Sequence, residues 1–350
     1  MTSAVLGQGT GALLRATLND HLGSGTPRLV VIGLSRDENP KATILAFEPA
    51  RSSPRLVLKV SLGRGAVPAV LAEAAALAAV AELGPDLVGG TVPSLVDVRQ
   101  DATSAVLVTT VVPGVPMSVD YHGWRHTARP SAVREDLTDA VSWLDELARV
   151  PVRDVAVGNR SADARTQWTP SALTARLWSR WPDDAVARTV GDAVCSVASE
   201  LALPLDATGA IVHGDFWCGN VLRTGGIVTG VVDWEHAVVG GDPLRDVTRF
   251  VLAYVLYLDR HTRAGRTVGG HPGLVAGPWG EPVRYVAAGS GWLSEAVEAV
   301  VAGHLANTGR DPMRWRQALA LAAAEVAALA DEREFARRHL LLAAGLFPCC

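Results

Sequence analysis

Hydrophobic and polar positions alternate in short runs along the first third of the chain, which predicts β-strands. The runs are rich in Val, Leu and Ile and are bounded by Gly, Pro, Asn or Ser. After the third run, apolar residues recur every three or four positions from Ala69 to Leu83, and Gly84-Pro85 follows, which predicts an amphipathic helix. The expected strands are residues 28–34, 42–47, 55–62, 94–98 and 105–111, preceded by a short helix at 12–21.

The pattern changes to helical spacing after a segment with Pro and Gly at 112–116. A segment at 211–235 interrupts the helices and predicts strand, polar loop, strand, Gly-Gly turn and strand. Residues 262–284 are rich in Gly and Pro and are expected to form a long loop. The order of elements predicts an α+β protein. The expected helices are residues 131–150, 172–181, 184–201, 245–258, 291–307, 312–329 and 332–346.

Composition is typical of a soluble enzyme and excludes few functions. The 350 residues suffice for one large or two medium domains. A net charge of −4 gives no electrostatic reason to expect nucleic acid or an anionic membrane as a partner. The first twenty residues lack the pattern of a signal peptide, and no uninterrupted apolar run is long enough to span a bilayer. The four cysteines show no metal-ligand spacing, which favours reduced thiols in a cytoplasmic protein.

The basic residues point to one position. Only Lys41 and Lys59 are lysines, and the other 30 of the 32 basic residues are arginines. Lys59 lies within an apolar strand, where a compact ammonium group is expected to have a specific partner. Glu73 is the candidate, because it shares the inward face of the following helix with Val70, Leu77 and Val80. The alternative is that Lys59 and Glu73 are exposed on solvated faces.

The segment after residue 210 carries the candidate chemistry. His213 is followed by Asp215 two positions later and by Asn220 seven positions later, the spacing of a kinase catalytic loop. Phosphoryl transfer needs a carboxylate to orient and deprotonate an attacking hydroxyl, and oxygen ligands for Mg²⁺. Asp215 fits the first role, and Asn220 and the later Asp233 fit the second. The alternative is that these residues only form turns and caps.

Three motifs together resemble the aminoglycoside phosphotransferase/choline kinase-like family. They are His-Gly-Asp followed by Asn at 213–220, Val-Asp-Trp-Glu at 232–235, and Gly-Asp-Pro-Leu-Arg-Asp at 241–246. The resemblance implies a bilobal protein-kinase-like fold. A small N-terminal lobe, residues 1–112, would hold an antiparallel sheet with one helix, and residues 113–350 would form a larger, mostly helical catalytic and substrate lobe. The chain departs from protein kinases in lacking a Gly-x-Gly-x-x-Gly motif in the first hairpin.

The same resemblance implies the roles of the site residues. Lys59 and Glu73 would clamp the α and β phosphates of ATP, and backbone groups around Thr109 and Val111 would bind the adenine. Asn220 and Asp233 would bind Mg²⁺, and Asp215 would be the catalytic base. His213 and Asp246 would be structural, with Asp246 holding the backbone of the catalytic loop. Trp217, within that loop, is a candidate wall of the acceptor site, and Glu235 would reach either a metal-bound water or solvent.

The acceptor is the least determined feature. A kinase of polycationic aminosugars is expected to offer a surface rich in carboxylates, but residues 251–350 contain nine Asp or Glu and ten Arg. An amino-alcohol, a sugar, an aminoglycoside or another natural product with a free hydroxyl remains open. One alternative is a kinase of Ser or Thr side chains in a precursor peptide of a modified-peptide pathway. Another is a non-catalytic nucleotide-binding scaffold, although such a scaffold has no need for a base and two metal ligands together.

Overall fold

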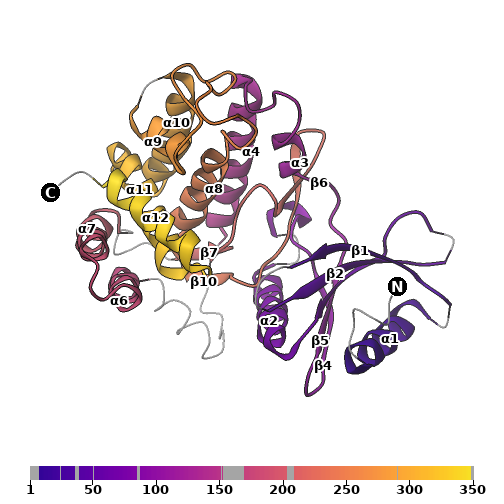
Figure 1. The fold of residues 1–350 in the computed structure, drawn as a ribbon. Helices are drawn as coiled ribbons and strands as arrows, with labels where there is room; N and C mark the ends of the chain where they lie inside the picture. Colours follow the sequence, from indigo (N-terminus) through magenta and orange to yellow (C-terminus); the bar gives the residue numbers. More distant parts are fainter. Residues whose placement is uncertain are drawn as a thin grey trace. The chain divides into compact units, whose positions relative to one another are not determined.

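A computed structural model shows two compact units, each described here by itself (Figure 1). Unit 1 comprises Met1–Gly114 and Thr229–Ala237, and unit 2 comprises Val115–Val228 and Val238–Cys350. The structure describes residues 8–23, 25–35, 39–49, 51–84, 87–150, 152, 169–202, 209–289 and 291–347. The proposed lobes 1–112 and 113–350 stay a prediction. The two compact units divide at Gly114, and residues 229–237 belong to unit 1.

Unit 1 contains an antiparallel five-stranded sheet in the order β1-β2-β3-β5-β4, which confirms the predicted sheet. Helices α1 and α2 lie on opposite faces of it (Figure 1). Two 3₁₀ turns, Arg64–Ala66 and Leu87–Gly90, flank α2. The bounds are α1 Gln8–Leu22, β1 Arg28–Leu34, β2 Lys41–Phe47, β3 Leu56–Ser61, α2 Val67–Leu83, β4 Leu95–Gln100 and β5 Ala105–Thr110.

The alternation along β3 explains how the sheet presents its functional side chain. Leu56, Leu58 and Val60 are buried in a core that includes Leu14 and Leu18 of α1. Successive side chains of a strand point to opposite faces, so Lys59 lies on the other face, where it meets Glu73 of α2. The sequence pattern thus placed both residues correctly.

Helix α2 and the turn before it, Arg64–Leu83, form the one helix among the described residues that is long and apolar enough to cross a membrane. This run was not predicted from the sequence to be long enough to span a bilayer. The helix packs against β4 and β5 and buries Val70, Leu77 and Val80 in unit 1. Because it also buries Glu73 in an ion pair, we interpret it as a core helix.

Unit 2 is mostly helical, as predicted. A two-stranded sheet, β7 with β10, and the pair β6 with β8 support the loop after β7. Helices α4, α8, α10, α11 and α12 pack against one another in this unit (Figure 1). The strands of this region are β6 Val115–Pro116, β7 Ala210–Val212, β8 Val221–Thr224, β9 Ile227–Val231, whose last three residues belong to unit 1, and β10 Val238–Gly241.

The predicted helices of unit 2 are confirmed to within a few residues at each end. The buried side chains include Trp143 and Trp315. A short 3₁₀ turn, Pro312–Arg314, precedes α11. The helices are α3 Met117–Tyr121, α4 Pro130–Ala148, α6 Pro170–Arg180, α7 Ala185–Glu200, α8 Leu244–Leu256, α9 Glu281–Ala287, α10 Gly291–Asn307, α11 Trp315–Leu329 and α12 Arg333–Leu346.

The long loop predicted at 262–284 ends early, because α9 begins at Glu281. The loop has a small core of its own, made by Val268, Leu274 and Ala276 with Tyr285 packed against them. His271 is fully buried and bonds the carbonyl oxygen of Thr127 at 2.8 Å. The segment is therefore a packed part of unit 2. Residues 153–168, which precede the predicted helix at 172–181, lie outside the described residues.

Candidate active site

The loop that follows β7 carries the candidate catalytic residues of unit 2. The amide Nδ2 of Asn220 donates to the backbone oxygen of Asp215 at 2.9 Å and reaches its Oδ2 at 3.4 Å. The backbone N–H of Asp215 donates to Nδ1 of the buried His213 at 3.3 Å. These bonds close the loop on itself, so Asp215 and Asn220 are brought together as the motif predicted.

Asp246 binds the backbone of the same loop through its carboxylate, which confirms its predicted structural role. Its two carboxylate oxygens accept the backbone N–H groups of His213, at 2.5 Å, and Gly214, at 2.8 Å. Gly214 has φ +83°, a left-handed conformation that suits glycine. Burial raises the pKa of Asp246, against the charges of His213 and Arg245 and the two N–H donors, which favour the ionised form. The loop is thereby fixed to the first turn of α8.

Arg249 is a site residue that the sequence analysis missed. It lies one turn after Asp246 on α8, and its guanidinium donates to Oδ1 of Asp215 at 3.1 Å. The i,i+3 spacing from Asp246 was the available signal, because residues so spaced share a helix face. The candidate base is therefore held from two sides, by Asn220 of its own loop and by Arg249.

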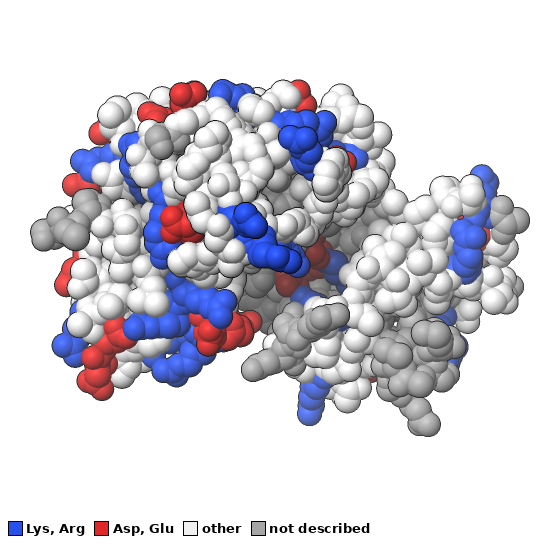
Figure 2. Space-filling model, turned by 45° about the horizontal axis from the view of Figure 1, so that its top comes forward, with Lys and Arg blue, Asp and Glu red and all other residues white. Residues whose placement is uncertain are grey.

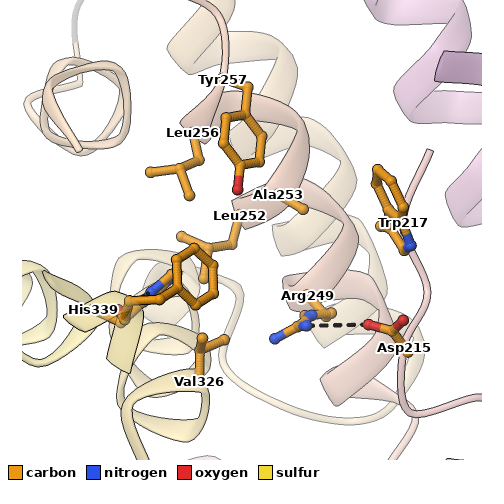
Figure 3. A pocket seen from close by; sticks show the side chains of 10 residues that line it. Asp215, Trp217, Arg249, Leu252, Ala253, Leu256, Tyr257, Val326 and His339 are labelled. Carbon is orange, nitrogen blue, oxygen red and sulfur yellow. Dashed lines mark hydrogen bonds and ion pairs between the residues drawn. The ribbon is translucent and has the colours of Figure 1, made fainter. Parts of the chain in front are cut away.

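A cavity of about 280 Å³ opens beside Asp215 within unit 2 (Figure 3). Asp215 and Trp217 of the loop form one wall, with Trp217 38% exposed, and α8 forms another. Helices α11 and α12 close it with apolar and aromatic side chains. Trp217 thus lines a cavity next to the candidate base, as it would in an acceptor site. The lining residues are Asp215, Trp217, Arg249, Leu252, Ala253, Leu256, Tyr257, Val326, Phe335 and His339.

Unit 1 contains the other predicted polar residues. The ammonium group of Lys59 donates to both carboxylate oxygens of Glu73 at 2.6 Å, which confirms the predicted ion pair. Lys59 also bonds the carboxylate of Asp233. Burial opposes the charged form of Lys59, but Glu73 and Asp233 together raise its pKa above the usual range. Lys59 therefore stays protonated throughout the physiological range.

The segment after β9 bonds both lysines of the chain. Asp233 has φ +69°, one of three non-glycine residues with positive φ among those described. Two residues on, Glu235 forms an ion pair with Lys41. Glu235 was expected to contact a metal-bound water or solvent, and the sequence analysis missed Lys41. The rarity of lysine was a signal for both.

The predicted adenine contacts lie at the end of β5. Thr109 is buried in that strand, paired with Val57 of β3, and Val111 follows the last strand residue, Thr110, and is half-buried. Their role in binding adenine stays a prediction. The turn of the first hairpin, which lacks the Gly-x-Gly-x-x-Gly motif, includes residues 36–38, which lie outside the described residues.

Asn220 and Asp233, the two residues expected to hold magnesium, carry oxygen atoms of the kind that Mg²⁺ takes as ligands. Among the described residues, no group of three or more His, Cys, Asp or Glu side chains is arranged to hold a metal ion. Mg²⁺ in such enzymes takes one or two protein oxygens and completes its shell with phosphate and water. Asp233 provides a carboxylate. The Nδ2 of Asn220 is used within the loop, so its amide oxygen is the atom that would remain for a metal.

Comparison with known proteins gives the family. Residues 46–279 match the phosphotransferase enzyme family, and the chain belongs to that family. The crystal structure of aminoglycoside phosphotransferase APH(4)-Ia is similar over 97% of this chain and 100% of that one, with 14% identity and a TM-score of 0.55. A thermostable mutant of the same enzyme, in ternary complex with ADP and hygromycin B, covers 95% and 97% with 14% identity and a TM-score of 0.51.

These comparisons confirm the suspected family and the kinase-like α+β fold, and the chain is accordingly an enzyme of the phosphotransferase class. No curated protein matches the sequence. At 14% identity the solved structures show the fold alone.

Proposed function

We propose that this enzyme transfers the γ-phosphoryl group of ATP, in the presence of Mg²⁺, to a hydroxyl group of a small molecule. The observation that carries the proposal is the fixed position of Asp215, which Arg249 and Asn220 hold at the wall of a cavity. A carboxylate placed beside a ligand-sized cavity is what a kinase needs to orient an acceptor hydroxyl. We place the reaction in the cytoplasm, where ATP is available.

The nucleotide side of the proposal rests on unit 1. Lys59, paired with Glu73, would hold the α and β phosphates, and the backbone at Thr109 and Val111 would bind the adenine. Asp233, together with Asn220, would bind Mg²⁺. The buried Lys59–Glu73 pair supports this role. Removing two charges from water costs several kcal/mol, so the pair is better explained by a function such as holding a ligand than by stability alone. The mutant of APH(4)-Ia binds ADP, which is consistent with a nucleotide site on this fold.

The mechanism assigns few covalent roles to the protein. Bound Mg-ATP supplies the phosphoryl group, with its negative charge reduced by the metal. Asp215 accepts a hydrogen bond from the acceptor hydroxyl and aligns its oxygen for in-line attack on the γ-phosphorus. It takes the hydroxyl proton as the new oxygen–phosphorus bond forms and the bond to the leaving ADP breaks. Arg249 orients Asp215, and Asp246 keeps the loop backbone in place. Positioning of the acceptor provides most of the rate.

The test separates the two sites by substitution. Asp215→Asn should lower phosphoryl transfer by about 10²- to 10⁴-fold while Mg-ATP binds normally, because only the base is lost. Asp233→Asn should weaken Mg-ATP binding itself. Asp192→Asn, on an exposed position of α7, is the control and should change neither. Product is identified by mass spectrometry of a metabolite extract incubated with Mg-ATP and each protein.

Three outcomes would overturn the proposal. Full transfer by Asp215→Asn would remove the role given to that residue. Phosphate found on Ser or Thr of a peptide, and on no metabolite, would favour a precursor-peptide kinase. Binding of Mg-ATP without transfer to any acceptor class would favour a nucleotide-binding scaffold.

A further inference from the structure

The cavity beside Asp215 is almost free of charge. Of the ten residues that line it, Asp215 is the one carboxylate, and Arg249 already pairs with it at 3.1 Å. His339 is buried, and burial lowers its pKa to about 4, so its imidazole is neutral at physiological pH. Burial also raises the pKa of Tyr257, which keeps its phenol neutral. The lining as a whole is neutral.

The remaining lining residues are aliphatic or aromatic. Leu252, Ala253 and Leu256 line it from α8, Val326 from α11, and Trp217 from the loop (Figure 3). On α12, Phe335 and His339 stack edge to face at 4.3 Å, so the aromatic wall is fixed. Burying an apolar group here gains about 25 cal/mol per Å² of surface removed from water.

The neighbouring cavity has no carboxylate among its lining residues. It has a volume of about 330 Å³ and shares Trp217, Ala253 and Tyr257 with the first, and its other lining residues are Tyr121, His122, Cys218 and Arg260. It adds a basic residue and no carboxylate. The shared wall means that a ligand longer than the first cavity would still meet no acidic side chain other than Asp215 among these lining residues.

We propose that the acceptor is an alcohol whose body next to the reacting hydroxyl is uncharged and apolar, either aromatic or aliphatic. The inference rests on the proposed function, in which Asp215 orients that hydroxyl. An ammonium group brought into this lining would lose its hydration and find no unpaired carboxylate, which costs several kcal/mol. An apolar body would lose only water. We therefore expect polycationic aminosugars to be poor acceptors at this site.

On the face seen in Figure 2, acidic and basic side chains are interspersed over the surface rather than gathered by sign. Wherever acidic side chains are visible on that face, basic side chains lie near most of them (Figure 2). This agrees with the neutral lining of the cavity.

The experiment uses two alcohols that differ by one ammonium group, 4-phenylbutan-1-ol and 4-[4-(aminomethyl)phenyl]butan-1-ol. Binding of each to the nucleotide-free enzyme is measured by ligand-observed NMR titration. We expect the neutral alcohol to bind at least tenfold more tightly than its ammonium analogue. Ala253→Phe, which fills the cavity from α8, should weaken the neutral alcohol at least tenfold. Ala306→Phe, the same change at an exposed position of α10, is the control and should leave binding unchanged.

The outcomes separate this inference from the proposed function. Equal or tighter binding of the ammonium analogue, no binding of either alcohol, or no effect of Ala253→Phe would overturn the inference, whether or not the enzyme transfers phosphate. Leu256→Gln, which places an amide in the same wall, gives a second check should Ala253→Phe fail to fold. If the alcohols bind as expected and no acceptor is phosphorylated from Mg-ATP, the cavity chemistry stands and the proposed function fails.

Discussion

At Gly219 the catalytic loop passes very close to the indole ring of Trp217. A Cβ atom placed there would lie 2.3 Å from the ring, closer than real Cβ contacts come. The glycine therefore allows the indole of Trp217 to pack close to its own loop and to form part of the cavity wall. This is a steric requirement, because the φ of Gly219 is not in the left-handed region. The indole of Trp217 can occupy this position because residue 219 has no side chain.

Gly219→Ala is expected to push the indole out of the cavity wall. Acceptor binding should weaken about tenfold, because an apolar contact of this size is worth about 1–2 kcal/mol. Mg-ATP binding should not change. Gly303→Ala, on α10 with no atom within 4 Å of the added methyl, is the matched control and should bind the acceptor normally. Titration of both variants with the neutral alcohol and with Mg-ATP checks this, and equal affinities would contradict it.

Residues were predictable where their spacing was local. Asp215, Asn220 and Asp246 followed from motif spacing, and Glu73 from its place on a helix face. Arg249 was missed because its partner, Asp215, is 34 positions away and reaches it only after the loop has folded on α8. Lys41 was missed for a similar reason, since Glu235 is 194 positions away. Contacts of this kind depend on packing between elements, which a periodic pattern does not encode.

At the scale of elements, α8 connects three parts of the site. Asp246 in its first turn holds the loop backbone, Arg249 one turn later holds the candidate base, and Leu252, Ala253 and Leu256 continue into the cavity wall. A rigid helix thus fixes the distance from the base to the acceptor cavity. A substitution in the first turn of α8 should therefore lower the rate of phosphoryl transfer.

Asp246→Asn tests this connection. The carboxylate accepts two backbone N–H groups, whereas an asparagine side chain can accept through one oxygen and would turn its NH₂ toward the second donor. An unmade buried hydrogen bond to a charged group costs about 2–3 kcal/mol of stability, and transfer should fall at least tenfold. Chemical denaturation and initial-rate assays measure these. Asp192→Asn serves again as the exposed control, and an Asp246→Asn protein as stable and active as wild type would refute the connection.

The pairing of β3 with α2 makes a second testable element contact. In Lys59→Met, Glu73 is left buried without its cation, whereas in Glu73→Leu the lysine keeps Asp233. Lys59→Met should therefore lower the free energy of unfolding by about 3–5 kcal/mol, which is more than Glu73→Leu lowers it. The double variant should lose less stability than the sum of the two single variants. Thermal unfolding of the four proteins completes the cycle. Strict additivity would show that the two side chains do not depend on each other.

At the scale of the whole molecule, the sequence predicted the elements well, and their grouping into two lobes stays a prediction. Most helices and strands begin and end within a few residues of their predicted bounds, because hydrophobic period and Gly or Pro boundaries are local signals. The assignment of 229–237 to unit 1 was not predicted. That segment joins unit 1 through bonds of Asp233 to Lys59, Glu235 to Lys41, and Val231 to Thr91, all of them distant in sequence.

Two buried histidines of unit 2, His271 and His339, should make the protein sensitive to acid. Burial lowers the pKa of both, to about 4 for His339 from an ordinary value of 6.5. Between those two pH values the unfolded chain binds a proton at His339 that the folded chain does not, so stability is complete above pH 6.5 and falls as the pH drops toward 4. With about 1.4 kcal/mol per pKa unit, His339 alone accounts for a loss of about 3 kcal/mol.

His339→Gln should remove that share of the acid sensitivity. The wild type should lose about 3 kcal/mol more than the variant between pH 7 and pH 4, measured as the free energy of unfolding in urea at each pH. The variant is expected to be somewhat less stable at pH 7, because the bond from His339 Nδ1 to the Phe335 carbonyl and the aromatic contacts with Phe335 and Trp279 are lost. The two stability curves should therefore converge as the pH falls. Parallel curves would mean that the imidazole is not neutral and buried in the folded protein, and the neutral lining of the acceptor cavity would have to be reconsidered with it.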